Sequence, residues 1–330
     1  MNKGFTLVEL LAVIVILGVL TLIVTISTGT ITKNSRTKLS NIQIENIKSA
    51  AQAYYLNEGI NYIDYEEESS EMCVNISYLM KKGYMDKAEI LDPKDNKKLD
   101  GSIIISYNSI NYTYDYSEDN CACAIVEDQN NDGIADVGDK ITCKTESFYV
   151  VSNENSKVSM LTEYNLDVGR IYNLNTKTYS DISNPTGLQK EEAIARVTGV
   201  TSVYGAIAFA RTDYWAGAVD KEFVYRSNVV SGVEQNLLYP HIENYEEYLK
   251  ENGVYSADAT MISYEDVVRL KAKYGHPSWV TATTYWTGTS GGSDKIYRVY
   301  NATFSAVKYT GDNAFGLRPL IKINESELFN

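Results

Sequence analysis

Apolar positions in the amino-terminal part of the chain follow two different patterns. Residues 10–24 are apolar except for Thr21 and Gly18, and with residues 5–8 and 25–26 they reach the ~20 residues that a membrane-spanning helix needs. Further along, apolar side chains recur at helical spacing and mark one face of an amphipathic helix: Ile44, Ile47, Ala51, Tyr54 and Tyr55. No proline interrupts residues 1–92. The two patterns predict one continuous helix over residues 5–58, ~80 Å long.

After residue 59 the pattern changes to short apolar runs between turn residues, which predicts strands and short helices. Residues 74–87 predict a short helix that ends at Gly83, and residues 101–116 predict a hairpin that turns at Asn108 and Ser109. Two amphipathic stretches, residues 238–253 and 259–275, predict helices in the C-terminal half, the second with Ser263 as its N-cap. The last residues alternate between strand-like runs and glycine-rich turns. The fold class is therefore predicted to be α+β.

Composition and charge exclude several classes of function. The chain of 330 residues carries a net charge of −13, so no basic surface is expected to hold a nucleic acid through its phosphates. Only two histidines occur, His241 and His276, which argues against a histidine-built metal or catalytic cluster. The 27 tyrosines are typical either of recognition surfaces or of strands with half-buried faces, and the sequence leaves both readings open.

Residues 3–10, Lys-Gly-Phe-Thr-Leu-Val-Glu-Leu, resemble the cleavage and methylation motif of type IV prepilins and type II secretion pseudopilins. The resemblance implies cleavage between Gly4 and Phe5 by a prepilin peptidase, and N-methylation of Phe5. It also implies a role for Glu9. Without such a role, a charged carboxylate inside an apolar membrane helix would only cost free energy. In this family the acid pairs with the amine of Phe5 on a neighbouring subunit during assembly. Lys3 and the α-amine place the leader in the cytoplasm and the C-terminus outside the cell.

The resemblance also divides the chain. It implies a leader at 1–4, a pilin helix at 5–58 whose part 5–28 lies in the membrane and then in the filament core, a pilin head at 59–150 built on an antiparallel sheet, and a further domain at 151–330. Residues 83–105 resemble the loop-to-sheet passage of Gram-positive pilins, which favours a Gram-positive source.

Four cysteines lie in the first half of the chain: Cys73, Cys121, Cys123 and Cys143. Outside the membrane they are free to oxidise, and each of Cys121 and Cys123 could pair with Cys73 or Cys143. The alternative is a four-thiolate zinc site, because Cys121 and Cys123 would point to the same face of a strand. Some Gram-positive pilins that this chain resembles bind a metal through cysteines, so both alternatives stay open.

An acidic stretch matches the spacing of a calcium-binding loop. The oxygen-bearing side chains fall at positions 1, 3, 5, 9 and 12 around the turn residue Gly133: Asp128, Asn130, Asp132, Asp136 and Asp139. Because the last position lacks the usual glutamate, and because Asn and Asp also favour tight turns, an acidic hairpin turn is the alternative.

The C-terminus carries a second resemblance. Residues 285–288, Tyr-Trp-Thr-Gly, and residues 315–321, Phe-Gly-Leu-Arg-Pro-Leu-Ile, are similar to the terminal signature of the C-type-lectin-like and formylglycine-generating-enzyme superfamily. The resemblance implies a lectin-like α+β domain with Trp286 in its core. No cysteine follows Cys143 and no nucleophile motif occurs, so we expect no enzyme. Tyrosines near the variable hairpin are candidate ligand contacts: Tyr297, Tyr300 and Tyr309.

These features predict a minor type IV pilin-like subunit that displays a lectin-like binding domain, and thus a candidate adhesin. Its expected partners are other pilin subunits, the prepilin peptidase, the membrane, and a glycan or protein on a host or other surface. It is expected in the cytoplasmic membrane before assembly and in the extracellular pilus afterwards. The alternatives are a pseudopilin of a secretion or DNA-uptake system, and a structural subunit that caps or spaces the tip. Calcium and zinc are the candidate cofactors.

Overall fold

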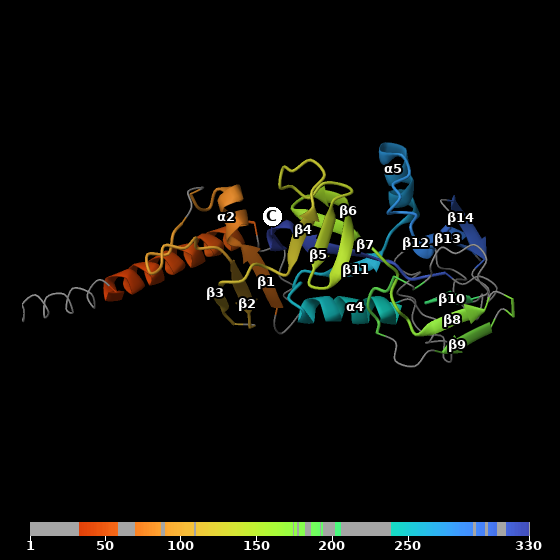
Figure 1. The fold of residues 1–330 in the computed structure, drawn as a ribbon, viewed down its shortest axis with the longest axis horizontal. Coiled ribbons are helices and arrows are strands. Elements are labelled where there is room, and N and C mark those ends of the chain that lie inside the picture. Colours follow the sequence, from red (N-terminus) through yellow and green to blue (C-terminus); the bar gives the residue numbers. More distant parts are fainter. Residues whose placement is uncertain are drawn as a thin grey trace, which may run out of the picture.

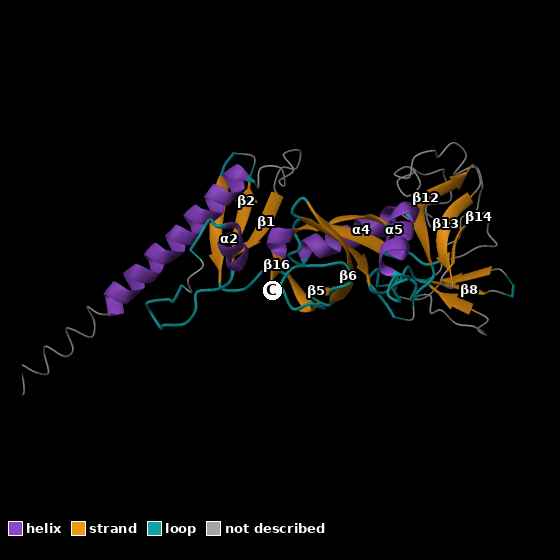
Figure 2. Cartoon of the chain, turned by 90° about the horizontal axis from the view of Figure 1, so that it is seen from above, coloured by secondary structure: helices purple, strands orange, loops and turns teal. Residues whose placement is uncertain are grey.

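The computed structural model describes residues 33–58, 70–86, 90–108, 110–173, 175–176, 178–181, 186–191, 193, 202–205, 239–292, 295–300, 303–308 and 315–329. These residues form an elongated α+β molecule (Figure 1). A long helix and a small sheet occupy one end, a larger sheet lies in the middle, and two small sheets occupy the other end. Figure 2 shows the same order from above, with the C-terminus near the middle of the molecule rather than at its tip.

The first part, here called the helix–sheet body, consists of the helix over residues 33–57, β1 (Ser70–Asn75), α2 (Ile76–Lys82), β2 (Ser102–Tyr107) and β3 (Tyr112–Ser117). The three strands form an antiparallel sheet in the order β1-β2-β3. The predicted face of the helix is confirmed, because Ile47 and Ala51 are fully buried against the sheet and Tyr54 and Tyr55 are 1% exposed. The predicted hairpin and the end of α2 at Gly83, which adopts a φ of +83°, are confirmed as well.

The second part, here called the distal body, is built around a seven-stranded sheet in the order β11-β15-β7-β6-β5-β4-β16. All neighbours are antiparallel except β16 and β4, which run parallel. The strands in chain order are β4 (Cys123–Glu127), β5 (Lys140–Cys143), β6 (Glu146–Glu154), β7 (Lys157–Thr162), β11 (Asp258–Met261), β15 (Pro319–Asn324) and β16 (Leu328–Phe329).

Each face of this sheet carries one of the two predicted C-terminal helices. On α4 (Tyr239–Glu251), Ile242, Tyr245 and Leu249 are each 1% exposed and share a core with inward residues of β6, β7 and β15. On the opposite face, Val267 and Leu270 of α5 (Tyr264–Tyr274) cover only part of the sheet. Both helix predictions are confirmed, and the hydroxyl of Ser263 accepts the N–H of Asp266 as predicted for an N-cap.

Two small antiparallel sheets form the end far from the long helix (Figure 1). One contains β8 (Arg170–Asn173), β9 (Thr178–Asp181) and β10 (Ser202–Tyr204). The other contains β12 (Tyr285–Gly292), β13 (Lys295–Tyr300) and β14 (Thr303–Lys308), which matches the strands expected near the C-terminus. Trp286 is fully buried, edge-on to Phe315, as the sequence predicts for a core residue.

The predicted border at residue 150 passes through the middle of β6. Residues on both sides of this position pair with neighbours in one sheet, since Phe148 lies opposite Ile141 of β5 and Asn153 lies opposite Val158 of β7. The structure therefore places β4, β5 and the start of β6 in the sheet of the distal body, not in the three-stranded sheet that packs on the long helix.

The C-terminal segment joins the two bodies. After β15, the 3-10 turn η4 (Glu325–Glu327) lies beside β1. The buried side chain of Asn75 donates to the Ser326 carbonyl at 3.2 Å and accepts the N–H of Cys121 at 3.0 Å. Lys81 of α2 forms an ion pair with Glu325 at 3.1 Å. The seam between the bodies thus combines the end of β1, the start of α2 and the last residues of the chain.

Residues 316–318, directly before β15, are closely packed. Arg318 is fully buried, and its guanidinium donates to the carbonyls of Thr162, Val280 and Glu163 at 2.6, 3.1 and 3.1 Å. Next to it, an added Cβ at Gly316 would lie 2.3 Å from Nδ2 of the buried Asn165. The Gly-Leu-Arg-Pro segment is therefore a structural element whose residue types follow from close packing and from satisfied buried donors.

Glu327 gives the seam a dependence on pH. Its side chain is 1% exposed, and burial raises its pKa to about 8, although the Ser256 N–H donates to it at 3.0 Å. Because its pKa is raised, this carboxyl group keeps its proton to a higher pH in the folded state than in the unfolded state. The free energy of unfolding should therefore fall as the pH rises from about 4.5 to about 8. Glu327→Gln should remove this loss and raise stability at pH 9 by a few kcal/mol.

The measurement is chemical denaturation of both proteins at pH 5 and pH 9. Glu251→Gln, at an exposed position of α4, serves as the control and should leave the pH dependence unchanged. A Glu327→Gln protein that loses as much stability as the wild type between these pH values would contradict the prediction.

Gly316→Ala should destabilise the distal body by about 2–3 kcal/mol, because the new methyl group displaces an amide whose N–H groups bind the carbonyls of Ala193 and Thr284. Gly187→Ala is the comparison, since nothing lies within 4 Å of a Cβ there and only its positive φ of +67° opposes the change. Thermal unfolding should show the larger loss at Gly316, and equal losses would contradict the packing explanation.

Candidate functional site

The predicted processing and assembly residues, Gly4, Phe5 and Glu9, lie outside the residues that the structure describes. The same is true of the predicted membrane segment at 5–28. Within the described part of the chain, no helix combines the length and the apolar character needed to cross a membrane. The described helix over residues 33–57 is the amphipathic half of the predicted long helix, and its exposed face includes Leu39, Ile42 and Leu56.

The four cysteines form two disulfides in the structure. Cys73 of β1 pairs with Cys121, and Cys123 of β4 pairs with Cys143, its direct neighbour across the ladder to β5. Of the two alternatives left open by the sequence, the structure therefore contains the disulfides, with no free cysteine among the described residues. One bond ties β1 of the helix–sheet body to the connection between β3 and β4, and the other closes the base of the acidic loop.

The acidic loop folds through its own hydrogen bonds. Asp128 accepts the N–H groups of Asn131 at 2.7 Å and Gly133 at 2.8 Å, and the Gly133 N–H is the main cause of its lowered pKa. Asn130 donates to Asp132 and Asp136, while the buried Asp139 accepts the N–H of Asp136 at 2.8 Å. No group of three or more acidic, histidine or cysteine side chains in the described residues is arranged to hold a metal ion. The predicted turn is present, and calcium binding stays a prediction.

The predicted tyrosine contacts are not gathered into one site. Tyr297 is partly buried, and its ring stacks on Tyr264 of α5 with centroids 3.8 Å apart. Tyr300 is 40% exposed and lies over the guanidinium of Arg298, which also contacts Phe315. Tyr309 lies outside the described residues. The stacking gives Tyr297 a structural role in holding α5 against β13, whereas Tyr300 remains accessible.

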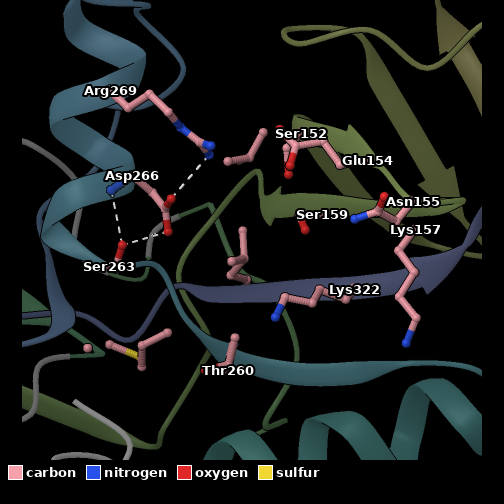
Figure 3. Close-up of a pocket in the computed structure, with 14 residues that line it drawn as sticks. Ser152, Glu154, Asn155, Lys157, Ser159, Thr260, Ser263, Asp266, Arg269 and Lys322 are labelled. Carbon is pink, nitrogen blue, oxygen red and sulfur yellow. Dashed lines mark hydrogen bonds and ion pairs between the residues drawn. The ribbon is translucent and has the colours of Figure 1, made fainter. Parts of the chain in front are cut away.

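A groove that the sequence did not reveal lies on the open part of the seven-stranded sheet, at the foot of α5 (Figure 3). Its volume is about 480 Å³. The floor is formed by outward side chains of four neighbouring strands, Thr260 on β11, Lys322 on β15, Ser159 on β7 and Ser152 on β6. The strand register aligns three of them in a row, because Lys322 lies opposite Ser159 and Ser159 lies opposite Ser152.

The first turns of α5 form one wall of the groove. Ser263 and Asp266 hydrogen-bond to each other at the N-cap, and Asp266 also forms an ion pair with Arg269 at 3.1 Å. A second hollow of about 490 Å³ continues along the helix and shares Ser152, Glu154 and Arg269 with the first. The two hollows therefore meet at Arg269 and follow one side of α5 from its start to Lys273 and Tyr274.

Sequence reasoning missed this groove because its residues come from strands that are far apart along the chain. The available signal was the polar half of each strand, such as Ser152 and Glu154 in β6 or Ser159 in β7. That pattern identifies a solvent-facing surface, but only the order β11-β15-β7-β6 shows that these surfaces adjoin.

The cysteine pairing leads to a direct prediction. Protein denatured in the presence of a chelator, without reductant, should contain no free thiols, because both pairs are closed. Exchange of Cys73 and Cys121 together for serine should lower stability by about 2–5 kcal/mol, since the bond closes a long loop between them. Thiol titration and denaturation measure the two effects, and four free thiols in the unaltered protein would instead support the zinc alternative.

Comparisons with known proteins bear on the amino-terminal segment. Residues 1–25 match the family described as the prokaryotic N-terminal methylation motif. No curated protein and no solved structure matches the chain. The match covers the residues on which the resemblance to prepilins rests, including Gly4, Phe5 and Glu9. A motif of this kind implies a membrane-anchored precursor, a prepilin peptidase that processes it, and assembly with other pilin subunits. The motif therefore supports a type IV pilin-like or pseudopilin subunit.

Proposed function

We propose that the protein is a minor type IV pilin-like subunit that displays the distal body on a surface filament and acts there as an adhesin. The observation that carries this proposal is the methylation motif at residues 1–25, followed by a helix at 33–57 whose apolar face packs on an antiparallel sheet. In this proposal the long helix is the part that packs with other subunits in the filament, here called the shaft. The three-stranded sheet packed on it connects the shaft to the distal body.

The size and position of the distal body favour a minor subunit. Its strands and helices extend away from the long helix in both views (Figures 1 and 2). A body of this size on every subunit would crowd the packing of neighbouring shafts, whereas a few copies at the tip or along the fibre would project freely. The accessible polar groove offers a surface on which such a body could bind a ligand.

Two alternatives use the same amino-terminal features. A pseudopilin of a secretion or DNA-uptake system would assemble through the same helix but remain in a short structure close to the membrane. A tip or spacer subunit would enter the filament and bind nothing. Immunogold labelling separates the first alternative, because an adhesin subunit should be found on extended surface fibres. The second alternative is tested by comparing fibres with and without this subunit for binding to cells or surface glycans. An adhesin subunit should increase this binding, whereas a spacer should not.

Glu9→Val should abolish or strongly reduce incorporation of the protein into sheared surface fibres. In the apolar helix the carboxylate is expected to pair with the Phe5 amine of a neighbouring subunit, and valine cannot make that contact. Glu118→Val, at an exposed turn after β3, removes an acid of equal charge and should leave incorporation unchanged. Membrane levels of each precursor are measured in parallel. Equal incorporation of wild type and Glu9→Val would overturn this role for Glu9.

A further inference from the structure

We propose that the groove at the foot of α5 binds an extended, hydroxyl-rich chain that carries anionic groups. A chain of this chemistry is found in acidic polysaccharides, where the anion is a carboxylate, and in polyol phosphate polymers, where it is a phosphate. The inference rests on the proposed function, because it names the class of surface ligand that the distal body would recognise.

The shape of the groove fits a chain rather than a single small molecule. The hollow beneath Ser263 and Asp266 and the hollow beside Lys273 and Tyr274 each measure close to 500 Å³, and they share the residues around Arg269. Both are open to solvent along α5. A ligand of several linked units could therefore lie along the helix and contact both hollows at once.

The floor presents hydroxyl groups with unused hydrogen-bonding capacity. The hydroxyls of Ser152, Ser159 and Thr260 make no hydrogen bond to any residue in the described part of the chain. Each can donate one hydrogen bond and accept others, which suits the alternating donors and acceptors of a sugar or polyol. Because they stand on rigid neighbouring strands, binding requires little ordering of the protein.

Basic side chains outnumber acidic ones among the residues that line the two hollows. Arg269 forms an ion pair with Asp266. Glu154 lies opposite Lys157 in the strand register, without an ion pair between the two. Lys322 also forms no ion pair with any described residue, although it is partly buried on the floor. Its register partner on β11, Asp258, is not within ion-pair distance.

A second lysine stands in the other hollow. Lys273 contacts the ring of Tyr274 at 5.1 Å but forms no ion pair within the described residues. Two acids line the same hollow, Asp136 and Glu154, and neither forms an ion pair with Lys273. Asp136 accepts a hydrogen bond from Asn130 at 2.9 Å. In a chain with a net charge of −13, two lysines without carboxylate partners in one groove favour a ligand that brings its own anions.

Calorimetric titration of the full-length protein in neutral detergent micelles tests the proposal with three probes. These are a galacturonic acid tetramer, a glycerol phosphate oligomer of similar length, and neutral maltotetraose. At least one acidic chain should bind at least tenfold more tightly than maltotetraose, and its affinity should fall as salt is raised. The acidic probe that binds identifies the carboxylate or the phosphate as the preferred anion.

Variants locate the binding in the groove. Lys322→Gln and Lys273→Gln should each weaken binding of the acidic chain about tenfold, as expected for loss of one charge-assisted hydrogen bond. Lys295→Gln, at an exposed position on β13 outside both hollows, is the matched control and should bind as the wild type does. Melting temperatures of the three variants should agree, since Lys322 and Lys273 form no ion pair in the folded protein.

Absence of binding by both acidic chains at millimolar concentration would overturn the proposal. So would equal binding of maltotetraose, or full affinity in both groove variants. The titration does not depend on filament assembly, whereas the proposed pilin role is tested in sheared fibres. If the protein binds acidic chains but does not enter fibres, the binding site is supported and the pilin role is overturned. If it enters fibres but binds no acidic chain, the pilin role is supported and the binding site is overturned.

Discussion

The amide side chain of Asn75 is the contact on which the arrangement of the molecule depends. It is fully buried at the end of β1, where it accepts the N–H of Cys121 and donates to the carbonyl of Ser326. One side chain therefore satisfies groups from two segments that lie 46 and 251 residues away. A buried amide that lost either partner would cost about 1–3 kcal/mol, so the three segments are held together as a set. The Cys73–Cys121 disulfide fixes the same place covalently.

This seam explains how a body as large as the distal one can be carried on a helix. After β15 the chain returns to the helix–sheet body through η4, where Ser326 also donates to the Cys73 carbonyl. The distal body is thus attached through both ends of its chain, at Cys121 and at Ser326. A single linker would leave it to swing, whereas attachment at two points defines its direction and that of its groove relative to the shaft.

Local pattern predicted the elements, and non-local pairing decided what they build. The face of the long helix, the N-cap Ser263, the glycine at the end of α2 and the hairpin of β2 and β3 all follow from neighbouring residues, and all are present. The order of the seven-stranded sheet does not follow, because β15 inserts between β7 and β11 from a distant part of the chain. The disulfides also depend on non-local pairing, since the spacing of the cysteines allowed either partner for Cys121 and Cys123. The groove could not be predicted for the same reason, because it is formed by strands that are far apart along the chain.

The edges of the seven-stranded sheet explain why recognition on it would use side chains. A free edge strand can bind a partner strand through its backbone, but the edge strand β11 is partly capped, since the Glu246 carboxylate of α4 accepts the Ala259 N–H at 2.7 Å. The face beside it is different: α5 covers the apolar part around Leu161 and Leu320, and leaves the row of Lys322, Ser159 and Ser152 uncovered. Solubility alone would be served by charged pairs on that face. Hydroxyls without protein partners and a lysine without a carboxylate leave hydrogen-bonding capacity on this face, which the proposed ligand would use.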